Sequence, residues 1–270
     1  MNAWPPGICR RWPRWLLLGL CVLVCLIDTA HSEDRLDDLL YRTSMQVSVL
    51  LERLSDVKCT EKVRQEKLSA DGKVERNLDS AYDYLVLFAN AGGELGLAES
   101  RLPLGEAKAD RKNTPMLVTN GFASLFLVFH PYYAGSFRFA DLDEEVNDGK
   151  RLKRVHFQYV RGTRSPAALA LRAREYPLQL SGTAWIDQDT AAVVRIVADV
   201  EHTLEDVGVR TLRTEVDYAP VAVGELQGSY LLPARATVEV STPRQHWRNT
   251  HVFTDYRQFS VSTKEQVTSK

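Results

Sequence analysis

The sequence predicts a mainly β (α+β) protein in which an antiparallel sheet is covered by an N-terminal amphipathic helix. Apolar residues recur at helical spacing in one segment near the N-terminus, and most later segments alternate apolar and polar residues with a period of two. Turn-forming residues separate those segments at short intervals. This arrangement is typical of a meandering antiparallel sheet with one face in water, and it disfavours parallel strands connected by helices.

The N-terminus has the layout of a secretory signal peptide. Basic residues precede an apolar run at residues 16–27, and small or polar residues follow as far as Ser32. The apolar run is shorter than the roughly 20 residues that a helix needs to span a bilayer. We therefore expect residues 1–32 to be a cleaved signal peptide and residues 33–270 to form one exported domain, soluble in the periplasm. A retained membrane anchor is the less favoured alternative.

Cleavage at this point would leave Cys59 as the single thiol of the exported chain. The other cysteines, Cys9, Cys21 and Cys25, all precede Ser32. No internal disulfide could then form, so the fold must be held by its hydrophobic core. A lipid anchor on Cys21 or Cys25 is disfavoured, because a bulky residue precedes each of them where lipoprotein processing requires a small one.

The charge composition excludes one class of partner. The chain has 34 basic and 35 acidic residues, which gives a formal net charge of −1. A nucleic-acid-binding domain usually carries a strongly basic face. We therefore expect no nucleic-acid partner.

Residues 35–56 are predicted to form an amphipathic helix. Its outer side carries both carboxylates and arginines, whereas a helix on a membrane surface usually has a basic outer side, so packing against its own domain is favoured. The apolar residues on the inner side are Leu36, Leu39, Leu40, Val47, Leu50, Leu51 and Leu54.

After Cys59 the sequence predicts a series of strands. Asp71-Gly72 and Gly92-Gly93 are turn signals, and they indicate two early hairpins. Two segments, residues 82–88 and 122–129, are apolar on both faces, so we expect them to be central strands. Polar segments rich in turn residues are predicted to be loops, and a short stretch between strands is at most a short helix. The predicted loops are residues 103–121, 141–150 and 202–208, and the short helix is residues 167–175.

One hairpin resembles a known family. Residues 180–187 read Leu-Ser-Gly-Thr-Ala-Trp-Ile-Asp, Arg195-Ile196 follows, and residues 230–234 read Tyr-Leu-Leu-Pro-Ala. This pattern resembles the LolA-like superfamily of outer-membrane lipoprotein-sorting proteins, as a divergent member. The resemblance implies that the sheet is curved into an unclosed half-barrel with a helix over its concave side. The residues themselves indicate a strand, a turn that Asp187 caps with its side chain, and a returning strand, so they support a fold more strongly than a function.

No motif for catalysis, cofactor binding or metal ligation is recognised in the sequence. His246 and His251 would lie on opposite faces of an extended strand, which disfavours a shared metal ion. An acidic segment at residues 141–148 precedes Gly149, but the glycine is not where a helix-loop-helix calcium site requires it. We therefore expect no enzyme, no cofactor and no metal.

The favoured function is a non-enzymatic carrier or sensor that holds acyl chains of lipid or lipoprotein in an apolar concave cavity. Two alternatives remain open: an exported binding or structural module without a lipid ligand, and a periplasmic enzyme. An envelope protein is a further candidate partner. Aromatic and leucine side chains on the predicted strands and helix would line the cavity. These candidates are Leu50, Leu51, Tyr84, Phe88, Phe126, Phe157, Tyr159, Trp185 and Phe253.

Overall fold

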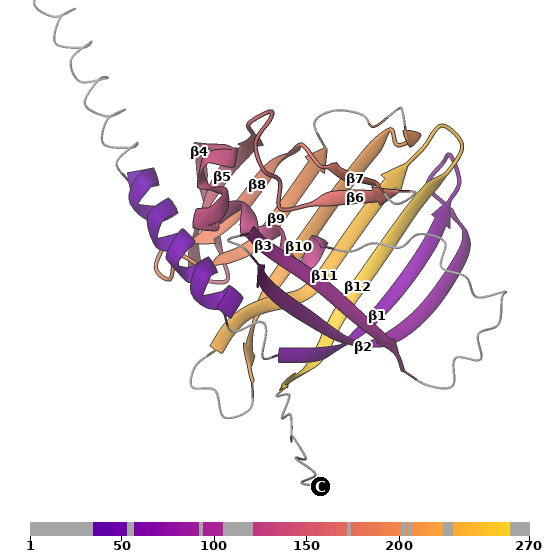
Figure 1. The fold of residues 1–270 in the computed structure, drawn as a ribbon, viewed down its shortest axis with the longest axis horizontal. Coiled ribbons are helices and arrows are strands. Elements are labelled where there is room, and N and C mark those ends of the chain that lie inside the picture. The colour runs from indigo at the N-terminus through magenta and orange to yellow at the C-terminus, as the bar shows by residue number, and fades with distance from the viewer. Residues whose placement is uncertain are drawn as a thin grey trace, which may run out of the picture.

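The computed structural model describes residues 35–52, 57–91, 94–104, 121–171, 174–200, 204, 207–223 and 229–259. The predicted signal peptide lies outside these residues. Within them the chain forms a ten-stranded antiparallel sheet and a separate two-stranded hairpin (Figure 1). The strands of the main sheet are β1 (Val57–Leu68), β2 (Val74–Ala91), β3 (Glu94–Pro103), β4 (Phe137–Asn147), β5 (Lys150–Tyr159), β8 (Leu180–Asp187), β9 (Val193–Val200), β10 (Thr211–Ala222), β11 (Ser229–Ser241) and β12 (His246–Gln258).

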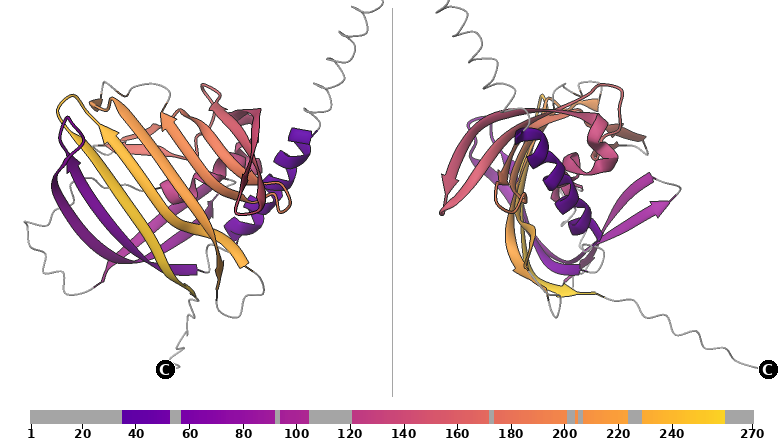
Figure 2. Two further views of the ribbon diagram at one scale, coloured as in Figure 1. Left: turned by 180° about the vertical axis from the view of Figure 1, so that it is seen from behind. Right: turned by 90° about the vertical axis from the view of Figure 1, so that its left-hand side faces the viewer.

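Neighbouring strands of the sheet are consecutive along the chain except at two places, where β1 lies beside β12 and β5 lies beside β8. The order is β3-β2-β1-β12-β11-β10-β9-β8-β5-β4, so the first and last strands of the chain, β1 and β12, pair in the middle. The sheet bends strongly, and its edge strands β3 and β4 are not paired with each other (Figure 2). The predicted unclosed half-barrel is therefore confirmed.

The segment 122–129 is not a strand, and this prediction was wrong. It forms a 3₁₀ helix, η2 (Phe122–Phe129), and a second one follows, η3 (Pro131–Ser136). Residues 125–129 are all buried, and η2 packs against β9, β10 and β11 inside the half-barrel. A segment that is apolar on every side fits a buried helix as well as a buried strand, so periodicity alone cannot separate them.

Two further predictions were wrong, because a predicted loop and a predicted short helix both form strands. Residues 141–150 belong to the β4–β5 hairpin, whose turn is Asp148-Gly149 with φ of 48° and 76°. They are polar because β4 is an edge strand and most of its side chains face water. Residues 167–175 contribute to a second hairpin, β6 (Ala168–Leu171) and β7 (Arg174–Pro177), and not to a helix.

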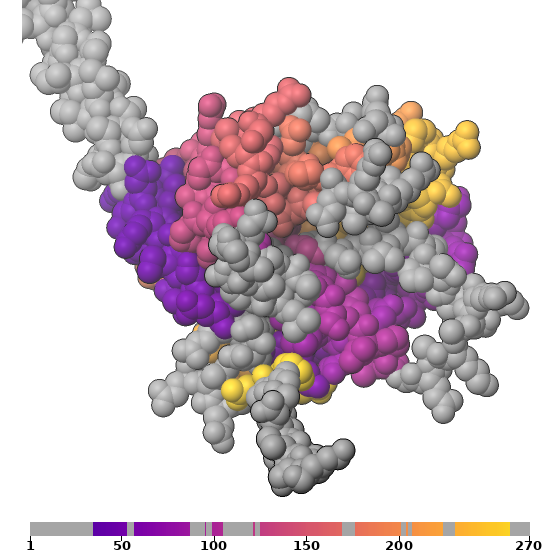
Figure 3. Space-filling model, in the orientation of Figure 1, coloured from indigo at the N-terminus to yellow at the C-terminus, as the bar shows by residue number. Residues whose placement is uncertain are grey.

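The N-terminal helix is observed over residues 35–52, and the predicted remainder lies outside the described residues. It lies across one end of the half-barrel, as the end-on view in Figure 2 shows. The Arg42 guanidinium donates to the carbonyl of Gln188 in the β8–β9 turn at 3.2 Å. The space-filling view shows the helix, in indigo, against the magenta part of the chain that contains β4 (Figure 3). Its inner side is buried through Leu36, Leu39, Thr43, Val47 and Leu51.

The core lies on the concave face of the sheet. A row of small and branched side chains runs across five neighbouring strands, and every member is fully buried: Val155, Ala184, Ile196, Val216 and Ala236. η2 fills the space in front of this row. Two separate covers thus shield the concave face, the helix at one end and η2 in the middle.

Candidate functional site

The best candidate site is a cavity between the N-terminal helix and one end of the half-barrel. Its volume is about 570 Å³. We call it the end cavity. Most of its wall is apolar, and polar groups come from the helix, the β8–β9 turn and the start of β5. The lining residues are Gln46, Val47, Val49, Leu50, Phe126, Lys150, Asp187, Asp189, Thr190, Ala192, Val193, Tyr218, Pro220, Tyr230 and Leu231.

The floor of the end cavity is built where η2 meets β10. The rings of Phe126 and Tyr218 pack edge to face with centroids 5.9 Å apart. The Tyr218 hydroxyl is hydrogen-bonded to the backbone of Phe126, and burial raises the pKa of Tyr218 well above its usual value. A neutral tyrosine therefore fixes η2 to the sheet, and this keeps Phe126 at the floor of the cavity.

The β8–β9 turn forms one side of the cavity mouth. Asp187 Oδ1 accepts hydrogen bonds from the backbone N–H groups of Asp189 at 2.9 Å and Thr190 at 3.1 Å. This confirms the predicted capping role of Asp187. Ala191 has a φ of 56°, and the turn returns directly into β9. The resulting short turn brings Ala192 beside the N-terminal helix.

The structure does not gather all the predicted cavity residues in one place. Leu50 and Phe126 line the end cavity, and Leu51 is buried beside them with 2% of its surface exposed. Phe157 and Tyr159 belong to the central core, where both pack against Phe137.

The other candidates lie elsewhere. Tyr84 on β2 and Phe253 on β12 contact each other, with ring centroids 5.4 Å apart. Trp185 lies on the opposite face of the sheet, between the guanidinium groups of Arg195 and Arg154. The side chain of Phe88 is outside the described residues. Sequence reasoning missed Tyr218, Tyr230 and Leu231, because nothing in a single strand shows which of its ends will face the helix.

A second feature of the concave face is a buried charge cluster of Glu61, Glu99, Arg101 and His251. Arg101 forms two bonds to Glu61, from Nε to Oε2 at 2.5 Å and from Nη2 to Oε1 at 3.0 Å. Nδ1 of His251 lies 2.8 Å from Glu61 Oε1, and Arg101 Nη1 lies 2.9 Å from Glu99 Oε2. Glu99 also accepts from the backbone N–H of Gly121 at 2.7 Å, just before η2. The cluster therefore connects β1, β3, β12 and the start of η2.

Burial and pairing act in opposite directions on the two carboxylates of this cluster. Burial opposes ionisation of Glu61, but the hydrogen bonds and charges of His251 and Arg101 outweigh it and lower the pKa of Glu61. Burial dominates at Glu99 and raises the pKa of that carboxyl despite Arg101 and Gly121. The burial of Glu61 had a signal in the sequence, because Glu61 lies in phase with the apolar Cys59 and Val63 along β1 and so points to the same face.

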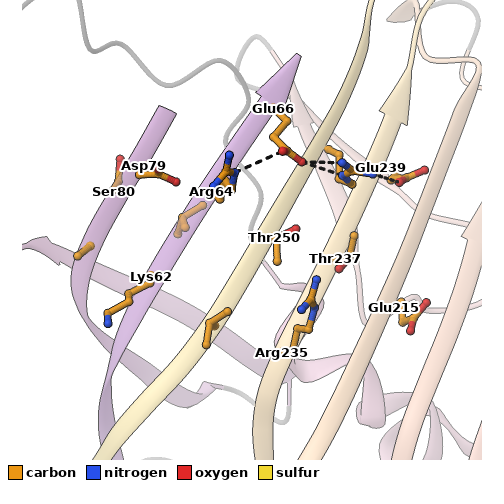
Figure 4. A pocket seen from close by; sticks show the side chains of 14 residues that line it. Lys62, Arg64, Glu66, Asp79, Ser80, Glu215, Arg235, Thr237, Glu239 and Thr250 are labelled. Atoms are coloured by element: carbon orange, nitrogen blue, oxygen red, sulfur yellow. Dashed lines mark hydrogen bonds and ion pairs between the residues drawn. The ribbon is translucent and has the colours of Figure 1, made fainter. Parts of the chain in front are cut away.

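The opposite face of the sheet is polar and carries a shallow hollow of about 1110 Å³ (Figure 4). Its charges pair with one another within β1 and across neighbouring strands. Arg64 Nε lies 3.3 Å from Glu66, Arg248 Nη2 lies 2.8 Å from Glu66, and Arg248 Nη1 lies 3.9 Å from Glu239. We call this surface the polar face. Its lining includes as many carboxylates as cations, so it does not favour a ligand of either charge.

Neither a group of potential metal ligands nor a membrane-spanning helix occurs in the described part of the chain. None of its histidine, cysteine, aspartate and glutamate side chains form a group that could hold a metal ion. None of its helices has the length and apolar character needed to cross a bilayer.

Comparison with known proteins gives structural matches alone. Neither a protein-family model nor a curated protein matches the sequence. A DUF1329 family protein from Desulfovibrio piger matches over 82% of this chain and 90% of its own, at 10% identity and a TM-score of 0.45. A LolA superfamily protein from Nitrosomonas europaea matches over 82% of this chain and 94% of its own, at 10% identity and a TM-score of 0.37.

An outer-membrane lipoprotein-sorting protein domain from Vibrio parahaemolyticus also matches. The match covers 80% of this chain and 90% of that one, at 10% identity and a TM-score of 0.39. LolA superfamily and lipoprotein-sorting proteins are thus among the solved structures that this chain is similar to, as the sequence resemblance predicted.

Proposed function

We propose that this protein is an exported, non-enzymatic carrier or sensor that binds an acyl chain of a lipid or lipoprotein in the end cavity. The observation that carries the proposal is the cavity itself. Its volume of about 570 Å³ lies within the range of roughly 300–1,000 Å³ that is usual for small-molecule sites. Its apolar wall comes from the helix, η2, β9, β10 and β11, and its polar groups gather at the mouth.

An acyl chain suits this wall because it gains affinity by leaving water. Burying one methylene group stabilises a complex by about 0.8 kcal/mol, which corresponds to about a fourfold change in the dissociation constant. Five of the fifteen lining residues are polar or charged, and the apolar remainder of the wall offers few hydrogen-bonding partners to a polar ligand of the same size. Affinity should therefore rise steadily with chain length until the cavity is full.

The N-terminal helix would act as the lid of the cavity. Val47 and Leu50 face the cavity from the helix, and the bond from Arg42 to Gln188 links the helix to the β8–β9 turn. Contacts of this kind can open and close without unfolding the sheet, whose strands are paired independently of the helix. Shortening Leu50 and Leu51 should therefore change the rate of ligand exchange as well as stability.

The predicted export supports the same function. The basic, apolar and small residues of positions 1–32 predict secretion, and a mature chain that begins near Glu33 would place the cavity in the periplasm. The Vibrio parahaemolyticus domain is described as a lipoprotein-sorting protein, and sorting of lipoproteins is one form that the proposed function can take.

A second candidate is a protein-binding module, with an envelope protein as its partner. Tyr41 and Met45 lie along the outer side of the N-terminal helix, with exposed fractions of 67% and 49%, and Val49, which is 47% exposed and also lines the end cavity, continues the row. A helix that is apolar on both sides is usually covered on both sides. This row is therefore the surface on which a partner protein would be sought.

The decisive experiment combines ligand identification with chain-length titration. Native mass spectrometry of protein from the exported fraction should show a bound lipid, and N-terminal sequencing should give Glu33. Fatty acids from octanoate to stearate should then bind about fourfold more tightly for each added methylene until affinity levels off.

A matched pair of variants locates the binding site. Ala192→Phe should fill the cavity and weaken binding of long chains by at least about tenfold, since several methylenes would lose their place. Val146→Phe places the same ring at a position that is 73% exposed, and it should leave binding unchanged. A protein that is empty when isolated and shows no dependence on chain length would refute the carrier function and favour the protein-binding module.

A further inference from the structure

The mouth of the end cavity carries three charged side chains, and two of them are already engaged. Oδ1 of Asp189 lies 2.8 Å from Nη2 of Arg151, so the two charges neutralise each other. Asp187 is 6% exposed, and its Oδ1 accepts from two amides of its own turn. The charge of Asp189 is thus paired with Arg151, and Oδ1 of Asp187 is held by its own turn.

Lys150 is the third charge, and its surroundings differ. It is the first residue of β5, directly after the tight Asp148-Gly149 turn, so the hairpin fixes its position at the mouth. Its side chain is exposed, and within the described part of the chain no ion pair joins it to a carboxylate. The nearby polar lining residues Gln46 and Thr190 are uncharged.

We propose that Lys150 recognises the headgroup of the ligand and that the ligand is an anionic amphiphile, with a carboxylate or phosphate at the end of its acyl chain. This inference rests on the proposed function, because it takes the acyl chain to fill the apolar wall. A chain seated against Leu50 and Phe126 places its polar end at the mouth, beside the lysine. The ammonium group of a lysine is a compact point charge, so it can pair with a carboxylate or with a phosphate without requiring one fixed geometry.

The size of the effect follows from the exposure of the site. Lys150 is at an open mouth and water screens it, so its preference for an anion should be modest. An exposed pair of this kind is expected to change the dissociation constant by about fivefold at low ionic strength. The preference should shrink as salt is added, whereas the contribution of the acyl chain should not.

The test compares four amphiphiles that share one chain length: palmitate, hexadecyl phosphate, hexadecanol and palmitoylcholine. The wild-type protein should bind the two anions about fivefold more tightly than hexadecanol. Lys150→Gln should abolish that preference and leave hexadecanol binding unchanged. Lys150→Glu should reverse it and favour palmitoylcholine. Lys73→Gln, at an 83% exposed lysine in the β1–β2 turn, is the matched control and should behave as the wild type.

The outcomes separate this inference from the proposed function. If all four amphiphiles bind equally, or if Lys150→Gln keeps the preference for anions, the headgroup assignment is wrong while the acyl site stands. If none binds, and shorter chains do not bind either, the acyl site itself is refuted. A stronger response to hexadecyl phosphate than to palmitate would identify a phospholipid headgroup as the source of the anion, and the opposite order would identify a free fatty acid.

Discussion

The two faces of the main sheet both carry ion pairs, but in different surroundings. On the concave face, Arg101 and Glu61 meet at 2.5 Å, and the Glu61 side chain has no exposed surface. On the polar face, Arg213 and Asp199 meet at 2.7 Å, and their side chains are 53% and 48% exposed. The two pairs differ little in distance. Burial, and not the distance between the charges, therefore decides what a pair contributes.

The physical reason is the state that remains when a pair is broken. Water replaces a lost partner on the polar face, so little free energy changes. On the concave face water is excluded, and a lost partner leaves an uncompensated charge in a region of low dielectric constant.

The largest effect is expected from Glu61→Gln. The substitution removes the carboxylate that holds both Arg101 and His251, and it should lower the free energy of unfolding by about 3–5 kcal/mol. Urea denaturation of the full exported chain measures this value. A loss below about 1 kcal/mol would show that the buried charge cluster is solvated like a surface pair.

The same carboxylate should make stability depend on acid. Because the pKa of Glu61 is lowered in the folded protein, its contribution is present above its ordinary value of 4.5 and is lost as pH falls through the folded pKa. Glu99 has a raised pKa, so its contribution has the opposite sign and is lost as pH rises through its folded pKa. Unfolding curves measured across this range should show the acid loss in the wild type and a smaller loss in Glu61→Gln.

Gly182→Ala should have the next largest effect, again on the concave face. A Cβ atom at Gly182 would lie 2.0 Å from the carbonyl oxygen of Val197 and 2.9 Å from the Phe157 ring. The strands must therefore move apart, which should cost about 1–3 kcal/mol or more. Gly135→Ala is the control, since a Cβ there meets nothing within 4 Å and Gly135 has no positive φ. Equal thermal midpoints for both variants would contradict the close approach of β8 and β9.

Trp185→Ala tests an aromatic residue on the polar face. The Trp185 ring lies 4.9 Å from the guanidinium of Arg195 and 5.7 Å from that of Arg154, and its Nε1 donates to Glu145 Oε2 at 3.0 Å. Cation–π contacts at exposed sites contribute about 0.5–1 kcal/mol each, so we expect a loss of about 1–2 kcal/mol. Chemical denaturation measures it, and a loss as large as that of Glu61→Gln would remove the contrast between the faces.

The smallest effect is expected from Asp199→Asn, which breaks an exposed pair. The free energy of unfolding should fall by about 0.5 kcal/mol or less, and the difference should shrink further in added salt. Denaturation at low and high ionic strength tests this. A salt-independent loss above about 2 kcal/mol would mean that the polar face is covered in solution.

Local signals in the sequence predicted much of the sheet but little of the site. Asp71-Gly72 and Asp187 act within a few residues, so their turns could be predicted from the sequence alone. The end cavity is different, because Leu50, Phe126 and Leu231 come from three distant segments. No property of one segment determines which others will lie beside it.

The sequence by itself determined the alternation of the strands, their turns and the inner side of the N-terminal helix, because each depends on neighbours within a few residues. Only the tertiary structure decided that residues 122–129 form a buried 3₁₀ helix, since an apolar segment fits either form until its surroundings are known. The tertiary structure also decided which charged side chains are buried. Glu61, Arg101 and His251 appear on three polar strands of the sequence, and strand pairing and η2 together enclose them, so burial is a property of the assembled sheet.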